Sequence, residues 1–596
     1  MAAPLLSPSA YATECTAPEH LHAMVDIGSN GIRFSISTLH PLTARVLPTL
    51  FTDRAAISLY DAQFQYSTIS LSHVKSPIPE ATIAAITTAL QRFKNVCATF
   101  RVPEAQIRVV ATEATRTAPN SDEFRAAIYD AVGWRVELLA KEDEGRVGAL
   151  GIASSFATVE GLVMDLGGGS TQLSWMVTRQ GDVKTADAAV SLPFGAAALT
   201  KKLATALDAT AIHAVAENIR EELTKAVSSL KLPKELEEAA KREGGYTLYL
   251  SGGGFRGFGY LLLAGHEISP YPLPIINGFS ASRDEFAKLA DSVGLELTNA
   301  QQEELSSQFR ISGRRAEQVP AVAFLVRNLL KSLPAIKEVV FCQGGVREGC
   351  LFDKLDVTTR AANPLVVATG VFAPPGAGKL ARLIGDALPK STPEVFWQLG
   401  VVSALANLLT YHAGVPREGR AAAGLHFTTT GQLGGTHGLT HHERVLLGLC
   451  LCARWGGEVA EGENGFRARL ERVVGGEMAW WARYIGSVAQ AVGAVFPGGI
   501  MLEGEGGRDS PVGAESRRLR RRLSEVDGKI SFFARDQERK GQLDIVLRIR
   551  VAKDDPDTAA VMVRKAAEDV EKVGKKKHCA ALGFRRKIAV IWETTD

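Results

Sequence analysis

The chain of 596 residues has few of the features that would assign it to a specialised class. Its seven cysteines are scattered and odd in number, and no Cys-x-x-Cys motif occurs, so neither a disulfide framework nor a zinc site is supported. No apolar run reaches the roughly 18 to 20 residues that a membrane-spanning helix needs. The net charge of +3 favours neither nucleic acid nor a membrane surface. These absences favour a cytosolic or nuclear protein.

The remaining composition is that of an ordinary globular protein. Hydrophobic residues make up 46% and charged residues 22% of the chain, and the length allows about four domains. The first twenty residues lack the basic start and apolar centre of a signal peptide, and we expect a disordered lead-in there. Cys450 and Cys452 lie in an apolar run and are expected to be buried small hydrophobic residues rather than metal ligands.

Two stretches of similar design, residues 24–33 and 164–172, organise the first half of the sequence. Each is an apolar strand that ends in an acid, Asp26 or Asp165, followed by a glycine turn and a second, roughly alternating strand. Glycines let a backbone approach an anion closely, and hydroxyl and amide side chains add neutral donors. The residues that we expect to bind phosphate in these hairpins are Gly28, Ser29, Asn30, Gly167, Gly168, Gly169, Ser170 and Thr171.

The two aspartates would repel a bare phosphate, so they make sense only beside a divalent cation, which carboxylate oxygens bind well. Asp26 and Asp165 are therefore the predicted metal ligands. Since the two stretches lie about one domain length apart, they predict a duplicated domain whose hairpins face one cleft. An ordinary glycine turn is the alternative for either stretch by itself.

Strands and helices alternate through the first 350 residues, which indicates an α/β fold. Two later strands, at 246–250 and 338–342, also run directly into glycine turns. Such turns are places where nucleotides or phosphates bind. We therefore add Gly252, Gly253, Gly344 and Gly345 to the predicted phosphate-binding residues.

The last third of the sequence predicts different structures. Residues 361–392 contain Pro and Gly and predict a connector, and residues 393–500 predict a helical domain. In it, His437, His441, His442 and Glu443 form a possible metal cluster, but Thr440 and Glu443 have the spacing of a capping box at a helix N-terminus. A run of arginines between 517 and 522 is typical of a solvated surface or, less typically, of nucleic-acid binding. Two alternating strands and a helix beyond it predict a small α+β module.

Five blocks in order make residues 20–350 resemble the exopolyphosphatase and guanosine pentaphosphate phosphatase (Ppx/GppA) family. They are residues 25–30, residues 110–116 with Asn120, residues 142–146, residues 165–171 and, together as the fifth block, the glycine turns at 251–254 and 344–345. The resemblance implies an actin, hexokinase and Hsp70-like ATPase fold built from two ribonuclease-H-like domains. We place these at 20–150 and 151–360, followed by a helical HD-like domain at 361–510 and a basic linker with the α+β module at 511–596.

The resemblance also implies roles for single residues. Glu144 matches the general base that orients water for attack on a terminal phosphoryl group, and Arg116 matches the arginine that holds the phosphate. Asp26 and Asp165 match the acids that position Mg²⁺ and the attacking water. Gln172 stands where the family usually has a glutamate, and a neutral amide cannot act as a base. The chain has no His-Asp dipeptide, so the HD-like domain is expected to lack metal.

Within the family, residues 172–175, residues 249–254 and the C-terminal module resemble the fungal retrograde regulation protein 2 group. This implies a cytosolic regulator that binds ATP or a polyphosphate and relays mitochondrial dysfunction to nuclear transcription by binding a negative regulator. A homodimer is compatible with the helical domain, and no membrane is expected. The alternative is an active hydrolase of inorganic polyphosphate or of guanosine penta- or tetraphosphate. Nucleic-acid binding is a third, less favoured class.

Overall fold

The computed structural model describes residues 14–65, 76–187, 189–206, 208–499, 530–539, 542–552, 558–575 and 579–595. The described residues belong to two compact units. The N-terminal unit comprises Ala12–Glu267 and Ile275–Ala362, and the C-terminal unit includes Ile268–Pro274 and Asn363–Asp596. The arginine run between 517 and 522 lies outside the described residues.

The first sheet of the N-terminal unit has the strand order β3-β2-β1-β4-β5. Its strands are β1 (Leu21–Gly28), β2 (Gly31–Thr38), β3 (Thr49–Ala55), β4 (Ile107–Ala111) and β5 (Val136–Leu138). β1 is antiparallel to β2, where Asp26 lies opposite Arg33, and parallel to β4. The predicted hairpin at residues 24–33 is therefore confirmed as β1 and β2.

The second sheet has the order β11-β12-β10-β6-β7-β8, with β9 paired to β7. Its strands are β6 (Glu160–Leu166), β7 (Thr171–Arg179), β8 (Asp182–Thr185), β9 (Val190–Leu192), β10 (Tyr246–Gly252), β11 (Ser280–Ser282) and β12 (Ile336–Phe341). β6 is antiparallel to β7 and parallel to β10, and Asp165 lies opposite Gln172. The path β8-β7-β6-β10-β12 thus repeats the order and directions of β3-β2-β1-β4-β5.

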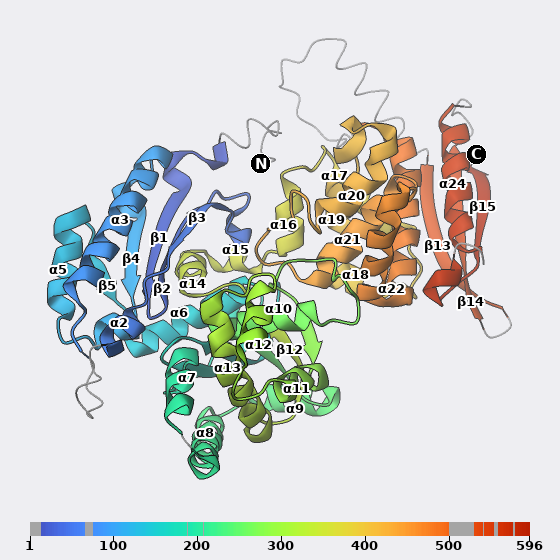
Figure 1. Ribbon diagram of the computed structural model, residues 1–596. Coiled ribbons are helices and arrows are strands. Elements are labelled where there is room, and N and C mark those ends of the chain that lie inside the picture. Colours follow the sequence, from blue (N-terminus) through green and yellow to red (C-terminus); the bar gives the residue numbers. More distant parts are fainter. Residues whose placement is uncertain are drawn as a thin grey trace. The chain divides into compact units, whose positions relative to one another are not determined.

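Alternate side chains of β1 enter two different cores. Val25 packs with α3 (Glu80–Phe100) and α5 (Ser121–Val132), which lie beside the first sheet in Figure 1. Met24, one residue earlier, packs with α6 (Lys141–Ser154) and α14 (Val346–Asp353), and Val163 of the second sheet joins the same cluster. The two sheets therefore share one core, built around α6 and α14.

Among the described residues, ten further helices belong to the N-terminal unit. They are α2 (Leu59–Gln65), α4 (Glu113–Arg116), α7 (Ala196–Thr205), α8 (Ala209–Ser229), α9 (Lys234–Glu243), α10 (Gly253–Ala264), α11 (Arg283–Ser292), α12 (Asn299–Ser307), α13 (Gly313–Ser332) and α15 (Val357–Ala361). Phe286 of α11 contacts Phe258 of α10 and Phe341 of β12. Short 3-10 turns lie at Pro18–His20, Ala44–Val46 and Glu104–Gln106.

The C-terminal unit is a helical bundle joined to a three-stranded sheet. Its helices are α16 (Pro364–Gly370), α17 (Ala377–Asp386), α18 (Val395–Gln398), α19 (Val401–Asn407), α20 (Arg420–Phe427), α21 (His441–Arg454), α22 (Glu461–Val495) and α24 (Thr558–Val573), with short turns at Tyr411–Gly414, Arg417–Gly419 and Ala580–Leu582. The strands are β13 (Ile530–Arg539), β14 (Gln542–Ala552) and β15 (Ile588–Thr595), and α24 runs beside them in Figure 1. Trp480 of α22 donates a hydrogen bond to the carbonyl of Val573, at the end of α24.

Two expectations from the sequence are wrong in part. Residues 14–20 are not disordered, because Cys15 is buried and its carbonyl accepts a hydrogen bond from Thr38 Oγ1. The expected connector at 361–392 contains α16 and α17, since Leu380 and Ile384 bury one face of α17.

The expectations for Cys450, Cys452 and Thr440 are confirmed. Cys450 and Cys452 are buried, free thiols. Thr440 caps α21 and forms the predicted capping box with Glu443. None of the described helices combines the length and apolar character needed to cross a membrane.

Candidate functional site

A pocket in the N-terminal unit gathers most of the predicted site residues. They come from β1 and β6, the turns that follow these strands, the start of α10, α6 and the start of α14. The predicted residues that line the pocket are Asp26, Gly28, Ser29, Asn30, Glu144, Asp165, Gly167, Gly168, Gly169, Ser170, Gly252, Gly253 and Gly345. Arg116, Thr171 and Gly344 are the predicted residues that do not line it.

The two glycine hairpins contact each other directly. A Cβ atom on Gly168 would lie 2.6 Å from Asn30 Nδ2, closer than side chains approach one another. Asn30 Oδ1 is buried and, within the described part of the chain, has no hydrogen-bond partner. The Asn30 carbonyl accepts a hydrogen bond from Arg54 Nη2 at 2.9 Å. The two hairpins therefore bring neutral polar atoms together in the same pocket.

Asp26 is only 4% exposed and lies 3.5 Å from the guanidinium of Arg33. Burial raises the pKa of Asp26 above its ordinary value, the charges of Arg33 and Arg347 oppose this, and the carboxylate of Asp165 adds to it. Two carboxylates that repel each other in a buried place suit a hard divalent cation. The carboxylate oxygens of Asp26 and Asp165 and the amide oxygen of Asn30 line the same pocket and fit Mg²⁺. This ion binds through one or two carboxylates and retains water or phosphate oxygens as its other ligands.

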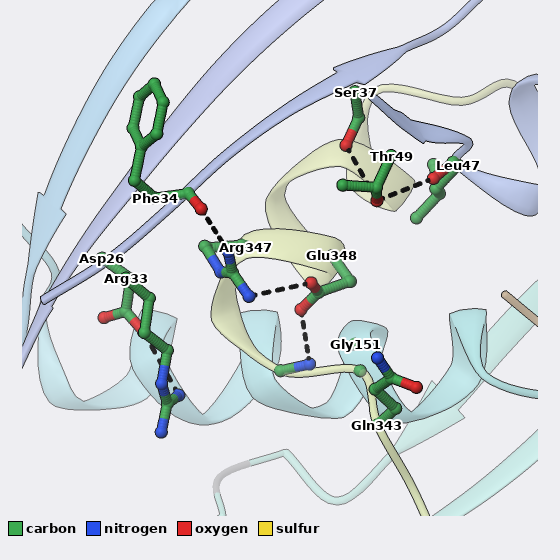
Figure 2. Close-up of polar contacts among 12 residues, drawn as sticks. Asp26, Arg33, Phe34, Ser37, Leu47, Thr49, Gly151, Gln343, Arg347 and Glu348 are labelled. Atoms are coloured by element: carbon green, nitrogen blue, oxygen red, sulfur yellow. Dashed lines mark hydrogen bonds and ion pairs between the residues drawn. The ribbon is translucent and has the colours of Figure 1, made fainter. Parts of the chain in front are cut away.

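Figure 2 shows how the start of α14 contacts the strand that pairs with the strand of Asp26. Arg347 Nη1 donates to the carbonyl of Phe34 in β2 at 3.0 Å, and Glu348 lies 3.4 Å from Arg347 Nη2. Glu348 Oε2 also accepts a hydrogen bond from the backbone N–H of Gly345 at 2.9 Å. The turn before α14, which belongs to the second half of the unit, is thereby tied to the first sheet.

Gly344 has a packing role. A Cβ atom there would lie 2.0 Å from the carbonyl oxygen of Gly151, so α6 and the turn before α14 meet through bare backbone. Thr171 is likewise committed elsewhere, because its Oγ1 donates to the carbonyl of Phe194 at 2.8 Å. Gly252, in contrast, needs glycine for its conformation, since its φ of 91° lies in a region that other residues avoid.

Glu144 and Arg116 form an ion pair beside the pocket. Both terminal nitrogens of Arg116 lie 3.3 Å from Glu144 Oε2, and Nη1 also donates to the carbonyl of Leu139. Burial raises the pKa of Glu144 to about 7, although the charge and hydrogen bond of Arg116 oppose the shift. A carboxylate with this pKa can accept a proton near neutral pH, as a general base must.

The raised pKa of Glu144 predicts a pH-dependent stability difference. Well below its unfolded-state pKa of 4.5 the carboxyl is neutral in both states. Between that pH and about 7 the unfolded chain releases the proton while the folded chain keeps it, so stability falls across this window and stays lower above it. Glutamine mimics the neutral form at every pH. We therefore expect Glu144→Gln to raise the free energy of unfolding by about 3 kcal/mol near pH 8 and to change it little near pH 4.

Urea unfolding of both chains at several pH values measures this difference. The control is Glu142→Gln, since Glu142 is an exposed carboxylate on the same helix. A Glu144→Gln difference that stays constant with pH would show that Glu144 is not a buried, protonated carboxyl.

Five arginines that line the pocket were not predicted from the sequence. They are Arg33, Arg54, Arg256, Arg314 and Arg315. Burial, together with the positive charges of Arg33 and Arg315, lowers the pKa of Arg256 to about 10. Burial, followed by the charges of Arg33, Arg315 and Arg314, also lowers the pKa of Arg54. Mutual repulsion among guanidiniums is relieved by a bound anion. Arg33 and Arg256 each follow a predicted glycine turn closely, which is a signal that could have identified them.

Glu113 and Gln172 are among the other polar residues that line the pocket. Glu113 of α4 lies against the second hairpin, since a Cβ atom on Gly169 would be 3.0 Å from Glu113 Oε2. Gln172 donates from Nε2 to Ser191 Oγ at 3.1 Å and to Ser170 Oγ at 3.4 Å. Gln172 therefore orients a hydroxyl of the hairpin. Across the described residues, no group of three or more His, Cys, Asp or Glu side chains is arranged to hold a metal.

Comparisons with known proteins cover nearly the whole chain. A model of the Ppx/GppA phosphatase family matches residues 39–358, and a model of the RTG2 C-terminal domain matches residues 363–595. The chain is 39% identical over 565 residues to retrograde regulation protein 2 of Saccharomyces cerevisiae, which covers 93% of this chain and 94% of that protein.

Solved structures match only part of the chain. The crystal structure of the Aquifex aeolicus member of the Ppx/GppA family is 23% identical, covers 56% of this chain and 97% of its own, and has a TM-score of 0.44. An exopolyphosphatase from Cytophaga hutchinsonii is 17% identical, covers 56% and 99% of the two chains, and has a TM-score of 0.40.

Proposed function

The chain belongs to the Ppx/GppA phosphatase family, and we propose that it is a signalling regulator that binds ATP or a polyphosphate with Mg²⁺ in its hairpin pocket. The observation that carries this proposal is the direct approach of Gly168 to Asn30, which brings both glycine hairpins to one pocket. A single glycine turn is common, whereas two that face each other beside a pair of aspartates suit a ligand with several phosphates.

The charge of each pocket residue determines which part of the ligand it would bind. Backbone N–H groups and the hydroxyls of Ser29 and Ser170 donate to phosphate oxygens, and the arginines offset the ligand's negative charge. Asp26 and Asp165 would hold Mg²⁺, which neutralises phosphate charge when it is bound. Asn30 Oδ1, which is buried without a partner among the described residues, is placed to accept a hydrogen bond from a water or ligand group there.

Binding can affect the rest of the unit through α6 and α14. Both helices contribute to the pocket lining and to the core that the two sheets share. A ligand that prefers one arrangement of the two halves would shift the population toward it. We propose that this shift controls binding of a negative regulator of retrograde transcription, in the cytoplasm and with a homodimer as a possible assembly.

We also propose a type and bounds for each domain of the chain. The strand order shared by the two sheets supports two ribonuclease-H-like domains, at 20–150 and 151–360. The helices of the C-terminal unit support an HD-like domain, at 361–510, that works as a scaffold without metal. The α+β module, at 511–596, would complete that scaffold.

A second candidate function is hydrolysis of inorganic polyphosphate or of guanosine penta- or tetraphosphate. The observation that favours it is Glu144, whose pKa of about 7 and position beside Arg116 suit a general base. Gln172 favours slow turnover, because a neutral amide cannot act as a second base.

Equilibrium binding to the purified full-length chain tests the proposed function. ATP and inorganic polyphosphate are titrated in Mg²⁺ and in EDTA, and we expect binding of at least one of them that depends on Mg²⁺. The absence of binding by both in the presence of Mg²⁺ would contradict the proposal.

A further inference from the structure

A second cavity lies entirely within the C-terminal unit, and α20, α21, α22 and α24 contribute to its lining. Its volume is about 1540 Å³, above the roughly 300–1,000 Å³ of usual small-molecule sites. Two of its acids are neutralised, since Glu471 pairs with Arg483 at 2.5 Å and Asp569 pairs with Lys572 at 2.7 Å. The other two, Glu418 and Glu458, are exposed.

Arg454 stands out among the cations of this cavity. It lies at the end of α21, is only 7% exposed, and donates from Nε to the carbonyl of Leu409 at 3.2 Å. Within the described part of the chain, its two terminal nitrogens have no hydrogen-bond partner and it forms no ion pair. Burial and the positive charge of Arg420 lower its pKa to about 10. A buried charge without a counter-charge is costly, and this cost needs a reason.

A structural role does not supply that reason, as a second buried arginine of the same helix shows. Arg444 is fully buried, but its terminal nitrogens donate to the carbonyls of Leu433, Gly434 and Thr436. The loop before α21 thus folds around Arg444 to satisfy it. Nothing among the described residues does the same for Arg454.

The residues around Arg454 also favour this position of its guanidinium. Its Cζ lies 4.2 Å from the centroid of the Trp455 ring, and Arg420 Cζ lies 5.1 Å from the same centroid. Trp455 Nε1 is buried and has no hydrogen-bond partner among the described residues. A Cβ atom on Gly493 would lie 2.1 Å from Arg454 Nη2, so α22 has no side chain where the guanidinium passes. Attraction to an aromatic ring does not replace the hydrogen bonds that the guanidinium lacks.

We propose that this cavity binds the phosphate group of a small phosphorylated molecule through Arg454, with Arg420 and Arg417 beside it. All three arginines line the cavity, and none of them forms an ion pair within the described residues. Several uncompensated guanidiniums call for more than one negative charge, and their planar forks match phosphate oxygens. The site is separate in sequence from the hairpin pocket and does not rest on the function proposed for that pocket.

Calorimetric titration of the full-length chain with inorganic pyrophosphate in EDTA tests the proposal. Any binding at the hairpin pocket is common to the wild-type chain and the Arg454→Met variant, so the difference between the two titrations reports the effect of Arg454. We expect Arg454→Met to weaken pyrophosphate binding by about 10-fold or more, since a charged, bidentate contact is lost. The matched control is Arg472→Met, because Arg472 is exposed on α22 and does not line the cavity.

Two outcomes would overturn the site: equal pyrophosphate binding by the wild-type chain and Arg454→Met, and tighter binding of citrate than of pyrophosphate. If the melting temperature of Arg454→Met falls so far that its binding cannot be measured, Arg417→Met decides instead, because Arg417 is exposed and its side chain forms no hydrogen bond within the described residues. The proposal requires this variant also to weaken binding.

Discussion

Replacing Asp165 with asparagine is expected to weaken Mg²⁺-dependent binding of ATP or polyphosphate by about 100-fold or more. Two unit charges about 4 Å apart interact by roughly 4 kcal/mol at the effective dielectric of a protein site, and a dication doubles that attraction. An asparagine oxygen is a neutral and much weaker ligand. Even if desolvation offsets about two thirds of this energy, about 2.7 kcal/mol remains, which corresponds to a factor of about 100.

The same substitution should have the opposite effect without Mg²⁺. Asp165 and Asp26 then present uncompensated negative charge to the phosphates, and removing one of these charges should strengthen binding in EDTA. Titrations of both chains, with and without Mg²⁺, measure this reversal. Asp182→Asn is a suitable control, because Asp182 is an exposed carboxylate of β8 in the same sheet. Equal weakening in Mg²⁺ and EDTA would mean that Asp165 does not act through a cation.

The hairpins were predictable from sequence because their signals are local. An apolar strand, an acid, a glycine turn and a second strand specify β1 with β2 and β6 with β7. The register that places Asp26 opposite Arg33 follows from the tight turn itself. Thr440 and Glu443 were equally readable, since a capping box needs only four consecutive residues.

The rest of the site depends on contacts between distant parts of the chain. Arg314 and Arg315 begin α13, about 300 residues from Asn30, yet Arg314 donates toward the Asn30 carbonyl at 3.5 Å. No periodicity near residue 314 signals that approach. Gly344 lies in a glycine turn that resembles a phosphate loop in sequence, but this glycine packs against the backbone of Gly151. Local sequence cannot distinguish close backbone approach to a ligand from close approach to a helix.

Glu144→Gln is expected to reduce any phosphate release from ATP, polyphosphate or guanosine tetraphosphate by about 100-fold or more while leaving affinity nearly unchanged. Glutamine keeps the shape of the side chain but cannot accept a proton. Wild-type turnover should rise with pH through about 7, as Glu144 loses its proton. Assays of phosphate release across pH, run beside the binding titrations, measure both quantities.

The result decides between the two functions. If the wild-type chain releases phosphate and Glu144→Gln does not, the protein is a hydrolase and the assay identifies its substrate. Hydrolysis of the bound ligand would then be a step in the signalling. Binding without turnover in the wild-type chain would instead assign Glu144 to holding Arg116 in place, with the ligand acting as a persistent effector. The two cases differ again in cells, because a regulator of the second kind should keep its signalling role in the Glu144→Gln variant. Loss of signalling in that variant, with ligand affinity intact, would require hydrolysis for the signal.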